Sequence, residues 1–268
     1  MFKKMSDRDY FALDALNNST LSDINRSVRF MEYRKNNKTE PTASMQIGSL
    51  VHCLLLNPED FDDLFIIMPK INKRTKDGKE EHQSLLDQAE AKQLALVEQS
   101  QVDQAIDIAA SVRSNRIAAQ LLDDLQHAEV VGLFQIDEIE CKAKFDGITS
   151  TQLIVDVKTT QDASPEAFAK SVATFGYHRQ DAFYCKAYEA VTGEKPSAFV
   201  FICVENKAPY STAVYVLDDE AKDLGEKEIN ALVKKYQEYK SGLYIQDYSS
   251  KIETLTLPAW YVRSKQDD

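Results

Sequence analysis

The sequence predicts a mixed α/β (α+β) fold in which a central mixed β-sheet is flanked by helices. In the first part of the chain, apolar residues recur mostly at helical spacing. Three segments rich in β-branched residues follow at 129–136, 139–149 and 152–160, and two more at 197–205 and 211–217 come after a helical stretch. This order of helices, three strands, helices, two strands and a helix is typical of a mixed sheet covered by helices.

Helices are expected through most of the first 125 residues. Thr20 and Asp23 have the spacing of a capping box, so one helix is expected to run from there to about Arg34. Pro58 ends a second, more apolar helix. This second helix and the next two are expected at about 44–57, 84–99 and 102–125.

The second half of the chain carries turn and capping signals. Asp137-Glu138 and Ser150-Thr151 are expected to be hairpin turns between strands. Ser164 followed by Pro165 predicts the start of a helix, because proline is favoured at the first helical position. Two longer helices are then expected at about 177–193 and 219–240.

A single domain spanning residues 1–268 is the simplest organisation, since the sequence contains no internal repeat and no Pro/Gly/Ser-rich linker. It is expected to comprise a mainly helical part at 1–125 and a sheet with flanking helices at 126–268. No segment has the apolar length of a membrane span or a signal peptide, so a cytoplasmic protein is expected. The cysteines are far apart with no CxxC pair, which favours free thiols over a zinc ribbon or an iron–sulfur cluster.

The formal net charge of −11 argues against a protein that coats nucleic acid, because polyanion binding draws on clustered lysine and arginine. It does not exclude a nuclease. A metal site needs carboxylates, and the bound cations reverse the local field. A few basic loops could still contact phosphates.

The strand at 152–160 carries the strongest chemical signal. Asp156 and Lys158 share one face of this strand, and a hairpin across Ser150-Thr151 could bring Asp146 beside them. Carboxylates bind Mg²⁺, and an ammonium can orient a water molecule, so such a cluster suits phosphodiester hydrolysis. An exposed Asp-x-Lys pair at a sheet edge is the alternative. It is disfavoured because Asp156 lies in a run that is apolar on both faces, where charged groups are rare unless they are paired or bind a metal.

Two helices carry weaker signals. Gln180 and Tyr184 are four residues apart and share a helix face, where they could hold a water or a phosphate, although a tyrosine packed on the core gives the same pattern. His52 on an apolar helix is either a hydrogen-bonded core residue or a metal ligand. Spacing alone leaves both alternatives open.

Several motifs, taken together, resemble the nuclease domain of RecE-type exodeoxyribonuclease VIII. The resemblance implies a PD-(D/E)XK restriction-endonuclease-like fold, shared with lambda exonuclease and the RecB nuclease domain. Phe145 stands where the motif's name has proline, a common departure in this superfamily. The matching segments are Gly48–Leu56, Pro58–Phe61, Asp156–Thr160 and Tyr177–Tyr184, with looser matches at 74–81 and 255–260.

The resemblance also implies a set of site residues and cofactors. It makes Lys158 the residue that positions the attacking water, and Gln180 and Tyr184 the Q-x-x-x-Y helix motif of the active site. Mg²⁺ or Mn²⁺ is the implied cofactor, with two ions per site. The implied metal ligands are His52, Asp146, Asp156 and the Val157 carbonyl, with Glu129 a weaker candidate.

The activity implied by the resemblance is 5′→3′ degradation of one strand of linear double-stranded DNA, which leaves a 3′ overhang for recombination. The implied partners are double-stranded DNA ends, other copies of the chain in a homo-oligomeric ring, a tetramer being favoured, and a single-strand annealing protein of RecT type. A phage or prophage origin fits this reading. The alternatives are a structure-specific or restriction-like endonuclease and a non-catalytic DNA-binding recombination protein. Expected DNA contacts are Thr159, Thr160, Lys73, Arg74 and Lys76.

Overall fold

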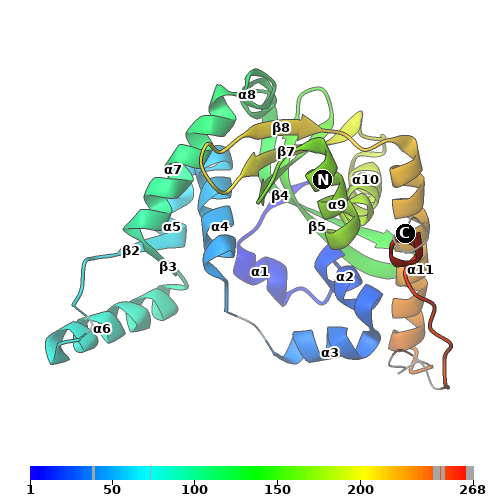
Figure 1. The fold of residues 1–268 in the computed structure, drawn as a ribbon, viewed down its shortest axis with the longest axis horizontal. Helices are drawn as coiled ribbons and strands as arrows, with labels where there is room; N and C mark the ends of the chain where they lie inside the picture. Colours follow the sequence, from blue (N-terminus) through cyan, green and yellow to red (C-terminus); the bar gives the residue numbers. More distant parts are fainter. Residues whose placement is uncertain (38–39, 73, 244–247, 249–250, 264–268) are drawn as a thin grey trace.

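The computed structural model describes residues 1–37, 40–72, 74–243, 248 and 251–263. Across these residues, six strands form a central sheet with helices on both faces (Figure 1). The strand order is β1-β4-β5-β6-β7-β8; β6 and β7 are parallel and the other neighbours are antiparallel. The expected fold, a mixed sheet flanked by helices, is confirmed. The strands are β1 (Lys3–Lys4), β4 (Leu125–Ile136), β5 (Ile139–Thr149), β6 (Leu153–Thr160), β7 (Ala198–Glu205) and β8 (Thr212–Tyr215).

Helices cover both faces of this sheet, and helices from the first part of the chain lie on both of them. Those that precede it in sequence are α1 (Asp7–Ala12), α2 (Asn18–Arg26), α3 (Val28–Asn36), α4 (Ala43–Leu56), a 3-10 turn (Pro58–Asp60), α5 (Phe61–Leu64), α6 (Lys76–Lys92), α7 (Gln99–Ser114) and α8 (Arg116–Asp123). Those that follow the central hairpins are α9 (Pro165–Phe175), α10 (Tyr177–Thr192), α11 (Asp219–Lys240) and α12 (Ala259–Arg263).

Side chains on the two faces of β6 pack into two separate hydrophobic cores. Ile154 packs with Phe201 in the core under α2, α9, α10 and α11, which we call the α10 core. Val155, Val157 and Ile202 pack in the core under α4, α7 and α8, which we call the α4 core. Because β6 is buried on both faces, it is held firmly between the two helical layers. Residues of β6 therefore point either towards α4 or towards α10.

The prediction of a single helix near the N-terminus is wrong. The chain forms α2 and α3, which are separated at Ser27. Ser27 has an extended backbone and its hydroxyl accepts from the N–H of Phe30, so it ends α2 and caps α3. The capping box expected from Thr20 and Asp23 is also wrong, because Asn17 caps α2 by accepting from the N–H of Thr20.

The start and the end of α6 also differ from expectation. α6 begins at Lys76, because Thr75 caps it, so the basic segment 70–79 is partly helical. Gln93 adopts the left-handed conformation and ends α6. The following residues form strand β3 (Ala95–Glu98), which pairs in parallel with β2 (Phe65–Met68), and Figure 1 shows this small sheet and α6 lying away from the central sheet.

The helix expected at 102–125 is broken in two at Asn115. The Asn115 side chain accepts from the N–H groups of Ile117 and Ala118, so α7 ends there and α8 starts. The later elements are confirmed. Ser164 is the N-cap of α9 with Pro165 at its first turn, and the two residues of the β4–β5 turn, Asp137 and Glu138, have positive φ.

Within the described part of the chain, no helix combines the length and the apolar character needed to cross a bilayer. The four cysteines are free thiols, and all but Cys185 are buried.

Helices α10 and α11 approach each other closely at Gly225. A Cβ atom added there would lie 2.2 Å from the backbone oxygen of His178, so we expect Gly225→Ala to destabilise the protein by about 1–3 kcal/mol. Denaturant unfolding measures this. Gly48→Ala on α4 is the matched control, since its nearest neighbour would be at an ordinary 3.4 Å and helix propensity alone would stabilise it by up to about 1 kcal/mol. Equal effects of the two variants would contradict this account of the packing.

Asp181 of α10 is a buried acid that accepts a hydrogen bond from Cys185 of the same helix. Desolvation raises its pKa to about 6, although a hydrogen bond from Cys185 and the charge of Lys222 oppose the shift. The native state therefore holds a proton that the unfolded chain releases near the usual value of 3.8, so Asp181 adds stability at low pH that is lost as pH rises through about 6.

We expect Asp181→Asn to remove this dependence and to gain stability relative to the parent between pH 4 and 7, by up to about 3 kcal/mol. Urea unfolding of both proteins at several pH values measures it. Parallel stability curves for the two proteins would contradict the assignment.

Candidate active site

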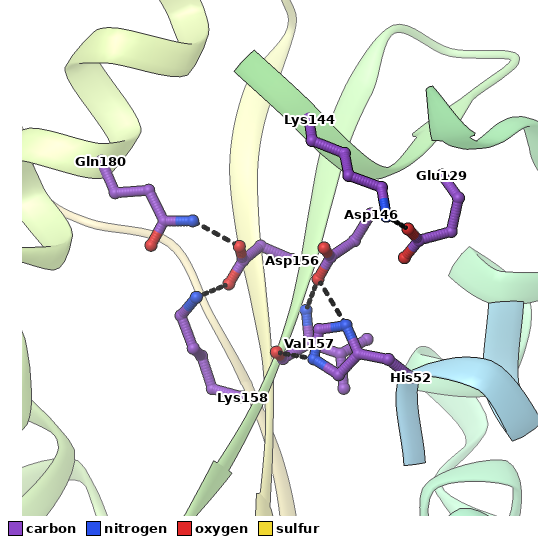
Figure 2. A network of polar contacts seen from close by, with 8 residues as sticks. All are labelled: His52, Glu129, Lys144, Asp146, Asp156, Val157, Lys158 and Gln180. Carbon is purple, nitrogen blue, oxygen red and sulfur yellow. Dashed lines mark hydrogen bonds and ion pairs between the residues drawn. The ribbon is translucent and has the colours of Figure 1, made fainter. Parts of the chain in front are cut away.

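The central strands β5 and β6 separate next to a half-buried carboxylate. Among the described residues they are paired only around Gly147 and Ile148, whereas β6 stays paired with β7 along its whole length. Beyond those two pairs, the N–H of Val157 donates to Oδ2 of Asp146 at 2.8 Å (Figure 2). The Asp146 side chain thus bridges the opening between the strands, where a substrate or an ion could approach the edge of each strand.

His52 reaches this opening from α4. One ring nitrogen, Nε2, lies 2.8 Å from the Val157 carbonyl oxygen, and the other, Nδ1, lies 3.4 Å from Oδ2 of Asp146 (Figure 2). Because a carbonyl only accepts, the hydrogen bond to Val157 requires the proton on Nε2, and in the neutral ring this leaves the lone pair of Nδ1 facing the carboxylate. Metal-binding histidines are oriented in this way, with one nitrogen bonded to a backbone carbonyl and the other free for the ion.

Glu129 of β4 lies at the level of Asp146, between the paired residues Ala128 and Val130. Its φ of 52° is rare for a residue with a side chain, and such strain is concentrated at functional sites. One Glu129 oxygen lies 2.5 Å from the Lys144 ammonium (Figure 2).

The possible ligand atoms of His52, Glu129 and Asp146 all lie within 4.8 Å of one another. Burial raises the pKa of Asp146 to about 6; a doubly protonated His52 would oppose this shift, and the carboxylates of Asp156 and Glu129 add to it. Crowded, desolvated carboxylates beside an imidazole make a region in which a cation is favoured. The donor set therefore fits a divalent metal ion.

Asp156 faces the other side of the opening, towards α10. Its Oδ1 accepts from Nε2 of Gln180 at 2.6 Å, and its Oδ2 lies 2.7 Å from the Lys158 ammonium (Figure 2). Burial alone would lower the pKa of Lys158, but the Asp156 and Asp146 carboxylates outweigh it and raise that pKa. Lys158 therefore stays charged at neutral pH, and it also lies 4.9 Å from the centre of the Tyr177 ring.

The described residues thus form two groups at one opening in the sheet. His52, Glu129 and Asp146 are on the α4 side, and Asp156, Lys158 and Gln180 are on the α10 side. Residues 19–258 match the family described as a PDDEXK-like domain of unknown function (DUF3799). The chain belongs to this family.

The fold of this PDDEXK-like domain also occurs in a known structure. A crystal structure of a protein named "Putative exonuclease", from Eubacterium rectale, superposes with a TM-score of 0.65 and 14% identity, over 97% of this chain and 98% of the other. At this identity the likeness shows the fold alone. No curated protein matches the chain. The expected PD-(D/E)XK superfamily is therefore confirmed, whereas a RecE-type assignment within it rests on the sequence motifs.

Tyr184 occupies a more enclosed place in the PDDEXK-like domain than the Q-x-x-x-Y pattern suggested. Its ring packs edge-on against Phe145 and Phe199, and burial raises its pKa well above the usual value. Gln180, one turn earlier, is the member of the pair that contacts Asp156. Tyr184 therefore packs against residues of β5 and β7 as a neutral phenol.

The expected DNA-contacting residues lie in different places. Lys76 is exposed in the first turn of α6 and pairs with Glu80, and Arg74 is exposed just before that helix. Lys73 lies outside the described residues. Thr159 borders the opening next to Gly48, while the Thr160 hydroxyl donates to the Asp162 carbonyl.

Sequence reasoning did not assign Lys144 to the site. Its ammonium joins Glu129 to Asp7 of α1, at 2.5 and 2.8 Å. The signal was present, because Lys144 is two residues from Asp146 on the same strand face. Glu129, a weaker candidate from sequence, lies within the cluster because antiparallel pairing of β4 with β5 sets it beside Asp146.

Proposed function

We propose that this protein is a divalent-metal-dependent nuclease that hydrolyses DNA phosphodiester bonds. The observation that supports this most directly is the arrangement of the sheet opening, with a His-Glu-Asp cluster on one side and a charged lysine on the other. Phosphodiester hydrolysis needs an ion near the phosphate and a group that positions water, and this arrangement offers a place for both.

In this proposal His52, Glu129 and Asp146 hold a Mg²⁺ or Mn²⁺ ion, which, when bound, neutralises phosphate charge and favours ionisation of water. Lys158 orients the attacking water and stabilises the developing negative charge. Asp156 keeps Lys158 in place, and Gln180 fixes Asp156. For Asp156 to bind a second ion, its carboxylate would have to turn away from Lys158. For the Val157 carbonyl to act as a ligand, His52 would have to release its hydrogen bond to that carbonyl.

We further propose that the substrate is a linear double-stranded DNA end, degraded 5′→3′ as in RecE-type enzymes. The sequence motifs at Gly48–Leu56, Asp156–Thr160 and Tyr177–Tyr184 support this, together with membership of the PDDEXK-like family. The same motifs support a homo-oligomeric ring, with a tetramer favoured, and a RecT-type annealing partner in the cytoplasm of a bacterial cell that carries phage or prophage DNA.

The deciding experiment offers the purified protein three substrates: linear duplex labelled at the 5′ end, linear duplex labelled at the 3′ end, and covalently closed circular duplex. Each is incubated with Mg²⁺, Mn²⁺ or a chelator. We expect early release of the 5′ label, late release of the 3′ label and an intact circle. Nicking of the circle would favour an endonuclease, and DNA binding without cleavage in either metal would favour a non-catalytic role.

Sedimentation of the protein, by itself and mixed with DNA, tests the ring. A monomer at micromolar concentration, with or without DNA, would reject the ring but leave the nuclease proposal standing. Processive release of nucleotides from long duplexes is the matching kinetic expectation.

A further inference from the structure

An exposed aromatic ring lies at the corner between α9 and α10. Phe175, the last residue of α9, is 60% exposed, and its ring centre lies 5.7 Å from that of Tyr177, the first residue of α10. Tyr177 in turn lies 4.9 Å from the Lys158 ammonium. Tyr177 therefore lies between the exposed Phe175 ring and Lys158, the lysine proposed to position water.

Phe175 is the exposed end of a row of rings that contains the buried Phe168. Tyr215 stacks on Phe168 at 5.3 Å and 14°, and Phe168 stacks on Tyr177 at 5.8 Å and 29°. The next member, Phe175, has one neighbour in this row and an open side. A flat aromatic group from a ligand could extend the row by one position. Phe201, behind the row, helps to hold Tyr177 in place.

The backbone of this corner is fixed, which reduces the entropic cost of binding. Gly176 has a φ of 72°, and a Cβ there would lie 1.9 Å from the guanidinium of Arg179. Arg179 is buried and donates to a Glu228 oxygen at 2.6 Å, and His178 contacts the same oxygen at 3.1 Å. The turn therefore holds the backbone on which Phe175 is carried in one conformation.

We propose that Phe175 stacks on an unpaired nucleobase next to the phosphodiester that is cleaved. This inference rests on the proposed nuclease function and assigns it a base-contacting residue. In a duplex the faces of a base are covered by its neighbours, so only a terminal or unpaired base offers a free face. Stacking on an aromatic side chain tolerates any base, which suits an enzyme without sequence preference. The site thus selects a frayed or single-stranded end.

The test measures binding of short single-stranded DNA in chelator, where the strand is not cut. We expect Phe175→Ala and Phe175→Leu to weaken binding by about 5- to 100-fold, and Phe175→Trp to retain it, because tryptophan keeps a stacking face and leucine does not. Tyr33→Ala on α3 removes an equally exposed ring and should bind as the parent does. Equal affinity of the leucine variant and the parent would overturn base stacking.

A second arm uses oligonucleotides with one abasic position moved along the strand. At one position, loss of the base should weaken DNA binding by the parent protein. The same loss should leave DNA binding by Phe175→Ala unchanged, since the aromatic stacking partner is already missing. A flat scan would overturn the proposal. The proposal would also be overturned if Phe175→Ala changed the sedimentation of the protein and this change explained the whole loss of DNA binding. Phe175 would then be a contact between subunits.

These outcomes can be told apart from failure of the nuclease proposal. A parent protein that cleaves DNA, with binding insensitive to Phe175, rejects the stacking site alone. A parent that binds single strands through Phe175 but cleaves no DNA in Mg²⁺ or Mn²⁺ rejects the nuclease function and retains the base contact.

Discussion

Asp146→Asn is expected to lower nuclease activity by at least about 10³-fold while leaving the protein folded. The Asp146 carboxylate lies between His52 and the Val157 N–H, in the group of side chains that could hold a metal ion. Loss of one anionic ligand removes several kcal/mol of charge stabilisation from the transition state, which corresponds to this change in rate. The measurement is initial rate on linear duplex with saturating Mg²⁺, paired with calorimetric titration of Mn²⁺.

Stability should not fall with activity in this variant. Burial raises the pKa of Asp146 to about 6, so above that pH the native protein carries a carboxylate in a place that disfavours its charge. An asparagine removes that charge and its oxygen can still accept from Val157. The midpoint of thermal unfolding at pH 8 is therefore expected to stay the same or to rise.

Asp123→Asn is the matched control, because Asp123 is paired with Arg113 at 2.6 Å on the surface, outside the site. It should keep both full activity and Mn²⁺ binding. Full activity of Asp146→Asn would remove the metal site from the proposal. Loss of activity together with a large loss of stability would mean that Asp146 is a structural residue.

The position of this site could be predicted from sequence only in part. Period-two alternation correctly sets Asp156 and Lys158 on one face of β6, and the ion pair of 2.7 Å follows from that. The place of Asp146 could not be deduced so simply. Regular pairing would put Asp146 on the same face as Asp156, but β5 and β6 separate after two paired positions and Asp146 turns towards α4.

Helix boundaries were the least predictable part of the fold, for a local reason. Ser27, Asn115 and Gln93 each end a helix through a single side chain or a single left-handed residue, while the apolar periodicity continues across the break. His52 illustrates the opposite case. Nothing in its helix distinguishes a core histidine from a ligand, and only its two distances, to Val157 and Asp146, show that it faces the opening.

Lys158→Met is expected to lower the rate of cleavage by about 10²- to 10⁴-fold without weakening metal binding. The Lys158 ammonium lies 2.7 Å from Asp156 and is separate from the His52, Glu129 and Asp146 group. A side chain that positions water or stabilises developing charge contributes to the rate in this range. The separation predicts that Mn²⁺ titration gives the parent affinity in Lys158→Met, in contrast to Asp146→Asn.

Removing Lys158 leaves Asp156 buried with Gln180 as its remaining partner, so some loss of stability is also expected. The double variant Asp156→Asn with Lys158→Met removes both charges and should recover that stability without recovering activity. This separates the cost of an unpaired buried charge from the loss of chemistry. Lys186→Met breaks a lysine–glutamate pair with the same 2.7 Å separation on the exposed side of α10, and it should leave the rate unchanged. If the double variant regained activity along with stability, Lys158 would act only by neutralising Asp156, and another group would have to position the water.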